Sequence, residues 1–282
     1  MSGVSYDPAA HVYDATRGYL PGVADKIRDV IVQATGSSAH TRYLELGVGT
    51  GRIALPFILA GNAYTGIDLS HAMLRRLMLK TSLHSASTNP RSRPVRGDVC
   101  RLPFMCDTFD VVVAVNVFHL VDDAMAALHE ARRVMTGSNG QLVIARDGRY
   151  EQPDAAVFAP SRLVQQHWRQ VLASLGVPRR ARSVSPWMRL DSEATGLLER
   201  SGATWKRLPT FEYESTGRSA RDAFEDLKTR AYSDEWSLPD DIHAQAIQRL
   251  ARWVNESCPR PDDTAPRVGR FDMIVARWAE GR

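Results

Sequence analysis

A chain of 282 residues with 44% hydrophobic residues is long enough to bury a core, which excludes an intrinsically disordered protein. Its 36 Lys and Arg outnumber its 32 Asp and Glu by only 4, without a run of like charges, so the composition does not favour a nucleic-acid-binding protein. The 3 cysteines lack metal or disulfide spacing, the N-terminal segment lacks a signal-peptide pattern, and the longest apolar run is too short to span a bilayer, which together predict a soluble cytoplasmic protein.

Apolar segments of strand type alternate with helical patterns along the chain. After a first helix near residue 23, we expect strands at residues 43–46, 63–68, 94–97, 111–116, 141–145, 205–213 and 271–278. Helices are expected between the first five strands, at residues 51–60, 71–83 and 124–135. Strands that are apolar on both faces belong to a covered parallel sheet. The predicted fold is therefore α/β: a Rossmann-like, doubly wound, mostly parallel seven-stranded sheet with helices on both faces.

The second half of the chain contains helical patterns that the sheet does not require. They lie at residues 154–175, 191–201, 220–232 and 239–257, with a loop at 176–188. We expect one domain over residues 1–282. Its parts are an N-terminal lid and first helix (1–40), a cofactor-binding core (41–150), and helical additions at 151–190 and 214–266 that form a substrate cap over the active-site mouth.

A glycine-rich loop follows the first expected strand. Residues 45–51 read E-x-G-x-G-x-G, and glycines at a strand-to-helix turn let a ligand approach the backbone closely. A dinucleotide-binding loop would place its third glycine at Arg52, whereas here it comes one residue earlier. An acidic residue before the glycines also suits a cationic ligand better than a pyrophosphate. The loop therefore argues against a nicotinamide-dependent oxidoreductase.

This loop resembles motif I of the class I S-adenosylmethionine-dependent methyltransferases. The resemblance implies S-adenosyl-L-methionine as the cofactor and S-adenosyl-L-homocysteine as the product. It places Glu45 near the amino group of the methionine moiety, often through water, and packs the backbone of Gly47, Gly49 and Gly51 against the cofactor.

Later segments extend the resemblance over about residues 40 to 147. In TGIDLS, the resemblance implies that Asp68 accepts both ribose hydroxyls, with Leu69 and Met73 as candidate adenine contacts. In RGDV, it implies that Asp98 accepts from the adenine amine and that the amide of Val99 meets the ring. Residues 109–116 and 140–144 resemble the fourth and fifth strands of the family, and Asn116 is a candidate cofactor contact at the end of the fourth.

Two segments outside these motifs carry candidate site residues. The N-terminal segment resembles the lid of small-molecule methyltransferases, with Tyr13 and Arg17 closing over the cofactor and Arg17 pairing with its carboxylate. His119 follows the fourth strand and is the candidate general base, because an imidazole can accept a proton near neutral pH. No His, Cys or acidic cluster has metal-ligand spacing, so no metal is expected.

The sequence predicts a methyltransferase that moves a methyl group to an O, N or C atom of a small-molecule acceptor by in-line displacement. It lacks the (D/N)PP(Y/F) segment of amino methyltransferases that act on nucleic-acid bases, having NVFH at residues 116–119. Nucleic-acid and membrane partners are therefore not expected. A noncatalytic S-adenosylmethionine-binding scaffold and, less favoured, an NAD(P)-dependent oxidoreductase remain alternatives. The sequence does not identify the acceptor or the oligomeric state.

Overall fold

The computed structural model describes residues 5–83, 92–151, 160–178 and 194–279. Its strands are β1 (Arg42–Leu46), β2 (Ala63–Asp68), β3 (Arg93–Arg96), β4 (Val111–Val115), β5 (Gln141–Glu151), β6 (Ala203–Arg207), β7 (Phe211–Arg218) and β8 (Ala265–Trp278). Its α-helices are α1 (Tyr13–Arg17), α2 (Val23–Thr35), α3 (Ala54–Leu59), α4 (His71–Leu83), α5 (Ala124–Val134), α6 (Pro160–Ser174), α7 (Thr195–Arg200), α8 (Ala220–Lys228) and α9 (Asp240–Glu256). Short 3-10 turns are η1 (Asp7–Ala9), η3 (Phe118–Leu120) and η6 (Ser233–Glu235).

All of these strands belong to one sheet in the order β3-β2-β1-β4-β5-β8-β6, with β7 also paired to β8. The pairings among β1 to β5 are parallel, whereas β8 runs antiparallel to β5, β6 and β7. The chain order reverses direction at β1, whose neighbours are β2 on one side and β4 on the other. Ligands of doubly wound sheets bind at such a switch point, at the carboxyl ends of the strands. The predicted α/β fold is confirmed.

Alternating side chains of the central strands enter two separate cores. On β4, Val112 and Ala114 face one side with the apolar residues of α5 and α7. Val111, Val113 and Val115 face the other side with those of α2, α3 and α4. Successive side chains of a strand point to opposite faces, so a continuous apolar strand is required where helices cover both faces. The continuous apolar character of these strands is the pattern that predicts them from the sequence.

Within the described residues, the sheet has one more strand than the seven expected, because the expected strand at 205–213 is two strands. β6 ends at Arg207 and β7 begins at Phe211, with Pro209 between them. A proline has no N–H to donate to a strand ladder, so the pairing is interrupted there. β8 accommodates both strands because it is 14 residues long and begins well before the expected residue 271.

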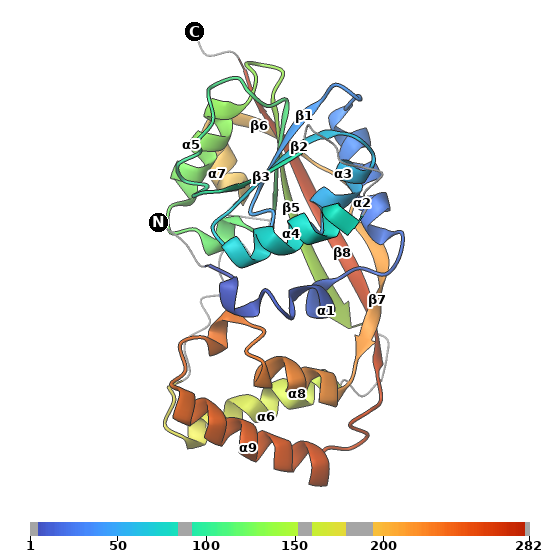
Figure 1. Ribbon diagram of the computed structural model, residues 1–282, viewed down its shortest axis with the longest axis vertical. Helices are drawn as coiled ribbons and strands as arrows, with labels where there is room; N and C mark the ends of the chain where they lie inside the picture. Colours follow the sequence, from blue (N-terminus) through green and yellow to red (C-terminus); the bar gives the residue numbers. More distant parts are fainter. Residues whose placement is uncertain (1–4, 84–91, 152–159, 179–193, 280–282) are drawn as a thin grey trace.

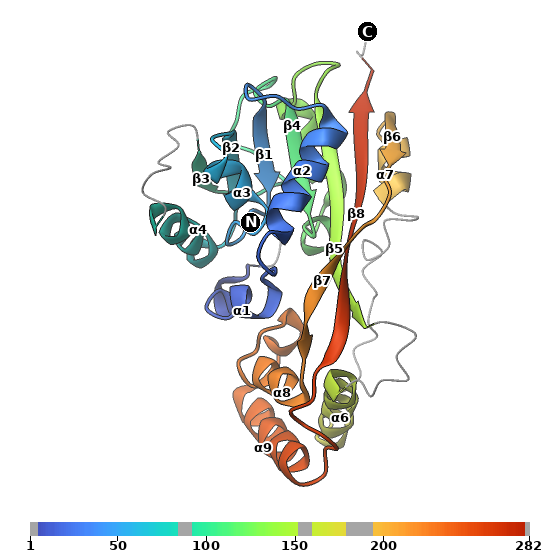
Figure 2. The ribbon, with the colours of Figure 1, turned by 90° about the vertical axis from the view of Figure 1, so that its right-hand side faces the viewer.

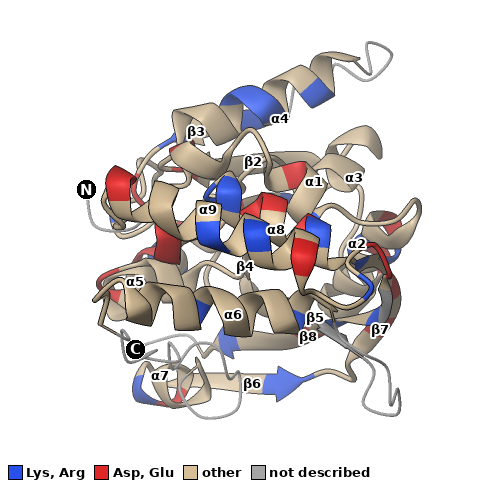
Figure 3. Cartoon of the chain, turned by 90° about the horizontal axis from the view of Figure 1, so that it is seen from below, with Lys and Arg blue, Asp and Glu red and all other residues tan. Residues whose placement is uncertain are grey.

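Helices α6, α8 and α9 form a three-helix cluster beyond the carboxyl ends of the parallel strands (Figure 1). The long strands β5, β7 and β8 extend from the sheet toward this cluster (Figure 2). The cluster has an apolar core of its own, which includes Val164 and Trp168 from α6, Leu227 from α8 and Leu250 from α9. Seen from below, the three helices lie across the end of the molecule (Figure 3). The N-terminal α1 lies between the cluster and the sheet (Figure 1).

Several expected helix bounds differ from those observed. The helix expected at 51–60 begins at Ala54, because the loop before it contains Gly51 with a φ of 81°. The helix expected at 220–232 ends at Lys228. Residues 154–159 of one expected helix, 191–193 of another, and 179–188 of the expected loop lie outside the described residues.

Candidate active site

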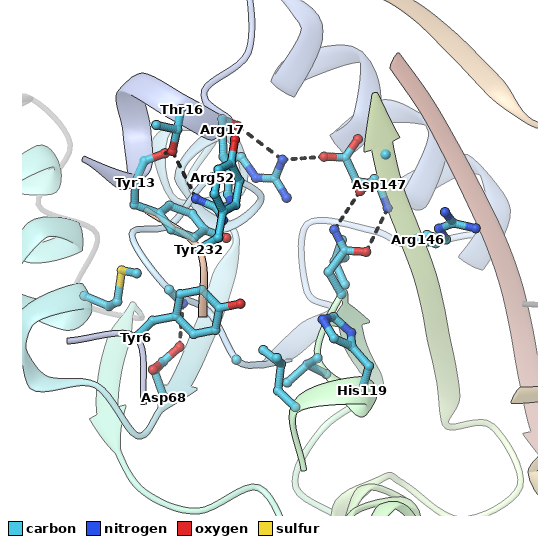
Figure 4. Close-up of a pocket in the computed structure, with 18 of the residues that line it drawn as sticks. Tyr6, Tyr13, Thr16, Arg17, Arg52, Asp68, His119, Arg146, Asp147 and Tyr232 are labelled. Carbon is cyan, nitrogen blue, oxygen red and sulfur yellow. Dashed lines mark hydrogen bonds and ion pairs between the residues drawn. The ribbon is translucent and has the colours of Figure 1, made fainter. Parts of the chain in front are cut away.

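A cavity of about 510 Å³ lies at the carboxyl ends of β1, β2, β4 and β5, and we call it the central cavity. The ends of these strands and the loops after them line its sheet side. The lining residues there are Gly47 and Gly49 after β1, Asp68 and Leu69 at the end of β2, Asn116 and Val117 after β4, and Asp147 within β5. The N-terminal segment and residue 232 line the side nearest the three-helix cluster, with Tyr6, Tyr13, Arg17 and Tyr232 (Figure 4).

The glycine loop after β1 depends on backbone conformations that other residues adopt poorly. Gly47, Gly49 and Gly51 have φ values of 67°, 55° and 81°. A Cβ on Gly47 would lie 2.5 Å from a methyl group of Val117, whereas a Cβ on Gly49 would meet nothing closer than 4.0 Å. The loop is thus tightly packed at Gly47, and Gly49 presents open backbone to the cavity.

Asp68 connects the end of β2 to this loop. Its carboxylate accepts a hydrogen bond from the Gly49 N–H at 2.8 Å and another from the Ser70 N–H at 2.8 Å, one on each oxygen. A carboxylate has about four lone-pair sites, so each oxygen keeps acceptor capacity for a ligand. Burial raises the pKa of Asp68, and the two backbone donors oppose that effect.

Three residues expected to contact the cofactor do not line the central cavity. Glu45 is 3% exposed beneath the loop, where it accepts a hydrogen bond from the Tyr64 hydroxyl at 2.9 Å, and burial raises its pKa to about 8. A Cβ on Gly51 would meet Leu77 of α4, so this glycine serves helix packing. Asp98 accepts from the Cys100 N–H at 2.9 Å and turns the chain after β3. The other nine, including Met73 and Val99, line the cavity.

Asn116 has a structural task at the cavity wall. It has a φ of 53°, and its side-chain amide donates to the Asp147 carbonyl at 2.8 Å while its side-chain oxygen accepts from the Asp147 N–H at 3.1 Å. These two hydrogen bonds join the end of β4 to β5 (Figure 4). Its side chain therefore holds Asp147 in place in addition to facing the cavity.

A buried ion pair adjoins this contact. The carboxylate of Asp147, whose side chain is 1% exposed, accepts from the guanidinium of Arg52 and from the hydroxyl of Tyr213. Arg52 also lies 4.8 Å over the Tyr19 ring and donates to the Arg17 carbonyl at 3.3 Å. The sequence pattern marks Arg52 only as the position where a dinucleotide-binding loop would have its third glycine, and it predicts that the fifth strand ends at residue 145, before Asp147.

Arg17 is held between aromatic rings. Its guanidinium carbon lies 5.0 Å from the centroid of the Tyr13 ring and 5.2 Å from that of the Tyr232 ring (Figure 4). It donates to the Ala231 carbonyl at 3.1 Å and to the Thr16 hydroxyl at 3.0 Å. An arginine has five N–H donors, so three remain for a ligand. Arg17 thereby links the N-terminal segment to the chain beyond α8.

The N-terminal segment is anchored to the sheet side of the cavity. Asp7 accepts from the Ser70 hydroxyl at 2.5 Å and from the Ala72 N–H at 3.0 Å at the start of α4. Asp14 accepts from the Thr50 hydroxyl at 2.6 Å and from Lys80 at 2.7 Å. These contacts hold the N-terminal segment against the cavity, which Tyr6, Tyr13 and Arg17 line.

His119 lies in η3, directly after β4, and faces the central cavity (Figure 4). Burial lowers the pKa of its imidazole, and the charge of Arg146 lowers it further. The ring is therefore neutral near pH 7 and can accept a proton. The structure thus places the candidate base where a ligand can reach it.

Several lining residues were not anticipated from the sequence. They are Thr16, Arg146, Gly148, Arg149 and Arg267. All come from the N-terminal segment or from the parts of β5 and β8 beyond their expected bounds, and no local motif marks them. Among the described residues, no group of three or more His, Cys, Asp and Glu side chains could hold a metal ion. No described helix combines the length and apolar character needed to cross a bilayer.

Comparisons with known proteins agree with this geometry. Residues 44–144 match a family model described as a methyltransferase domain. A demethylmenaquinone methyltransferase from Streptomyces avermitilis is 31% identical over 154 residues, or 54% of this chain and 62% of that relative, so the match spans less than two thirds of its length. A phosphatidylethanolamine N-methyltransferase from Cereibacter sphaeroides is 34% identical over 146 residues, or 52% of this chain and 68% of that relative.

Among solved structures, the cyclase SpnF resembles the chain with a TM-score of 0.54. The similarity covers 98% of this chain and 95% of that one at 17% identity. It supports the fold and nothing finer, because one fold hosts many activities.

Proposed function

The chain belongs to the class I S-adenosylmethionine-dependent methyltransferases, and we propose that it transfers a methyl group from S-adenosyl-L-methionine to an O, N or C atom of a small-molecule acceptor by in-line displacement. The cofactor supplies a methyl group activated by the sulfonium charge: as the acceptor's electron pair bonds to the methyl carbon, the C–S bond breaks and its electron pair stays on sulfur. What the protein must supply is positioning and exclusion of water.

The observation that carries this proposal is the pairing of Asp68 with the glycine loop. The carboxylate is fixed from both sides by the N–H groups of Gly49 and Ser70 and still has one acceptor site per oxygen. Two acceptors held side by side at the end of β2 match the two hydroxyls of a ribose. The open backbone at Gly49 leaves room for the ligand next to them.

An apolar wall beside Asp68 fits the adenine ring. Leu69, Met73 and Val99 all line the central cavity, and they come from the turn after β2, from α4 and from the loop after β3. Asp98 is not among the lining residues. We therefore assign the contact between the loop after β3 and the adenine ring to the backbone at Val99. Flat apolar contact and a few fixed polar groups are typical of small-ligand sites.

Two charged groups are proposed for the amino-acid end of the cofactor. The three remaining N–H donors of Arg17 are suited to a carboxylate, for which a planar guanidinium is a matched partner. Glu45 lies beneath the glycine loop, so its interaction with the amino group would pass through a bridging water.

His119 is the proposed general base for acceptors that lose a proton. Its neutral imidazole can take that proton, and its lowered pKa keeps it deprotonated over the neutral range. If it acts so, turnover should fall as the pH drops through this lowered pKa. His119→Gln should remove that dependence and lower kcat about 100-fold or more for an acceptor found by screening for S-adenosylhomocysteine release.

The first test is calorimetric titration with S-adenosylhomocysteine, with NAD and NADP run in parallel. We expect micromolar binding of S-adenosylhomocysteine alone, and about tenfold or greater weakening in Asp68→Asn, where two hydrogen bonds to a charged acceptor are altered. Asp241→Asn, an exposed position at the start of α9, is the matched control. Binding of a nicotinamide cofactor, or Asp68→Asn binding like the wild type, would refute the assignment. Binding without turnover on any acceptor would favour a scaffold.

A further inference from the structure

A second cavity of about 520 Å³ lies between the sheet and the three-helix cluster, and we call it the basic cavity. It shares Arg149, Tyr232 and Arg267 with the central cavity, so the two adjoin at these residues. A ligand that extends from one cavity into the other would pass them. The basic cavity is therefore accessible from the site of the proposed methyl transfer.

Charge distinguishes this second cavity from the rest of the chain. Five of its described lining residues are arginines, among them Arg162, Arg169 and Arg218, and one, Asp226, is acidic. The local excess of 4 positive charges among the described lining residues equals the excess of the whole 282-residue chain. Asp226 is already engaged, with Arg218 at 2.5 Å and with the Tyr232 hydroxyl at 2.8 Å.

Helix α6 contributes a polar stripe to this cavity. Arg162, Gln165, Gln166 and Arg169 line it at helical spacings of three and four residues. The buried Val164, Trp168 and Val171 of the same helix face the apolar core of the cluster. α6 carries no acidic residue, so the charged groups that it presents to the cavity are both cationic.

The other helices of the cluster, α8 and α9, have the charge pattern of an ordinary solvent-exposed surface. α8 and α9 carry acidic and basic residues interspersed along their lengths, as Figure 3 shows from below. Mixed charges of this kind are typical of a solvent-facing helix. The single-sign stripe of α6, turned toward a cavity, differs from that pattern and indicates a ligand of opposite charge.

We propose that the basic cavity binds an anionic group of the methyl acceptor, of the phosphate class, and thereby directs the acceptor toward the central cavity. This inference rests on the proposed methyltransferase function. The single carboxylate of the cofactor does not account for the cavity, because Arg162, Arg169 and Arg218 line only the basic cavity. Several planar guanidinium groups converging on one site suit the multiple oxygens of a phosphate.

A phosphate group of this kind has two sources: a free phosphorylated small molecule and the headgroup of an anionic lipid. We test both with the full chain at low ionic strength, where charge interactions are least screened. Inorganic pyrophosphate is titrated by calorimetry. Vesicles of phosphatidylglycerol, and of phosphatidylcholine for comparison, are tested by co-sedimentation.

The variants are Arg162→Gln, Arg169→Gln and the double variant, because both side chains are exposed on α6 and outside the central cavity. Each substitution should weaken pyrophosphate binding about tenfold, as expected for loss of a charge-assisted contact. Arg252→Gln, an exposed arginine of α9 outside the basic cavity, should bind like the wild type. Thermal melts verify that the variants stay folded.

The outcomes separate the two sources and the two proposals. If the wild type binds pyrophosphate but not vesicles, and the α6 variants lose this binding, the acceptor is a free phosphorylated molecule. If the wild type co-sediments with phosphatidylglycerol vesicles but not with phosphatidylcholine vesicles, and the same variants do not, the bound group is a lipid headgroup. The inference is overturned if the wild type binds neither probe or if the α6 variants bind as it does. Titration of every variant with S-adenosylhomocysteine tests the proposed function separately, and we expect its affinity to be unchanged.

Discussion

The two ends of the central cavity are built in different ways. At the end near β2, the groups that face the cavity are backbone of the glycine loop, one carboxylate and short apolar side chains, all close to β1, β2 and β3. At the end near the three-helix cluster, long aromatic and arginine side chains meet from the N-terminal segment, β5, β8 and residue 232. The first end is local in sequence, and the second joins segments more than 200 residues apart, as in the Arg17–Ala231 hydrogen bond.

This difference suggests a division of tasks. Backbone groups and a fixed carboxylate are rigid, and they suit a moiety that is constant, such as a nucleoside. Long side chains on separate segments can vary with little effect on the sheet, and they suit the parts of a site that differ between acceptors. We expect substitutions at the first end to alter stability or nucleoside binding, and substitutions at the second to alter recognition of the amino-acid moiety or the acceptor.

The largest effect is expected at Asp147, which lines the central cavity and pairs with Arg52. Asp147→Asn leaves the guanidinium of Arg52, whose side chain is 12% exposed, without its charged partner. Breaking a buried ion pair from one side costs about 3–5 kcal/mol of unfolding free energy. The comparison is Asp262→Asn, which breaks the pair with Arg221 at a side chain 72% exposed and should cost less than about 1 kcal/mol. Urea denaturation measures both, and equal shifts would contradict the assignment.

At the nucleoside end, Gly47→Ala should be the next most damaging change. The substitution adds strain at a φ of 67° and places a methyl group 2.5 Å from Val117, which together predict a loss of about 2–4 kcal/mol. Gly61→Ala is the matched control, because its φ is 84° and an added Cβ would meet nothing within 4 Å. Chemical denaturation of both variants separates strain from crowding. If Gly61→Ala lost as much stability, crowding against Val117 would have no role.

Glu45 predicts a pH dependence of stability. Burial raises its folded pKa to about 8, above its usual value of 4.5, so in this interval the folded state binds more protons than the unfolded chain. Its contribution is complete below pH 4.5 and is lost as the pH rises through 8. Between pH 5 and pH 7 the loss is about 2–3 kcal/mol.

Glu45→Gln removes this titration, so its unfolding free energy should decline less than that of the wild type across the same pH interval. Denaturation curves at several pH values give the two slopes. Glu256→Gln, at an exposed position of α9, is the control and should keep the wild-type slope. Parallel slopes for Glu45→Gln and the wild type would exclude a neutral Glu45.

The smallest expected effect, on ligand affinity in Arg17→Gln, is the most direct test of the difference between the two ends of the central cavity. Arg17→Gln should weaken S-adenosylhomocysteine about tenfold through the lost charged contact, but should leave methylthioadenosine, which lacks the amino-acid moiety, unaffected. Asp68→Asn should weaken both ligands. Arg75→Gln, exposed on α4, should change neither. Calorimetry measures all of these affinities, and equal losses for both ligands in Arg17→Gln would remove the proposed division between the two ends.

The sequence by itself determined the central sheet and the end of the central cavity that the glycine loop and Asp68 form. The central strands β1 and β4 are marked by buried apolar residues because helices cover both faces of the sheet there. The glycine loop and Asp68 are marked because their arrangement depends on residue type within a few positions. The same local reasoning missed the division of the expected strand at residues 205–213 by Pro209. Glu45, Gly51 and Asp98, which the sequence also predicts as cofactor contacts, lie near the loop without lining the cavity.

Only the tertiary structure decided the remainder. The Asp147–Arg52 pair, the Arg17–Tyr232 contact and the basic cavity each bring together residues separated by about one third or more of the chain. An arginine or tyrosine in a surface helix has the same local pattern whether it faces solvent or a cavity. Which residues that side chain contacts depends on the position of the three-helix cluster at the ends of the long strands β5, β7 and β8. That position results from packing between elements and not from any short motif.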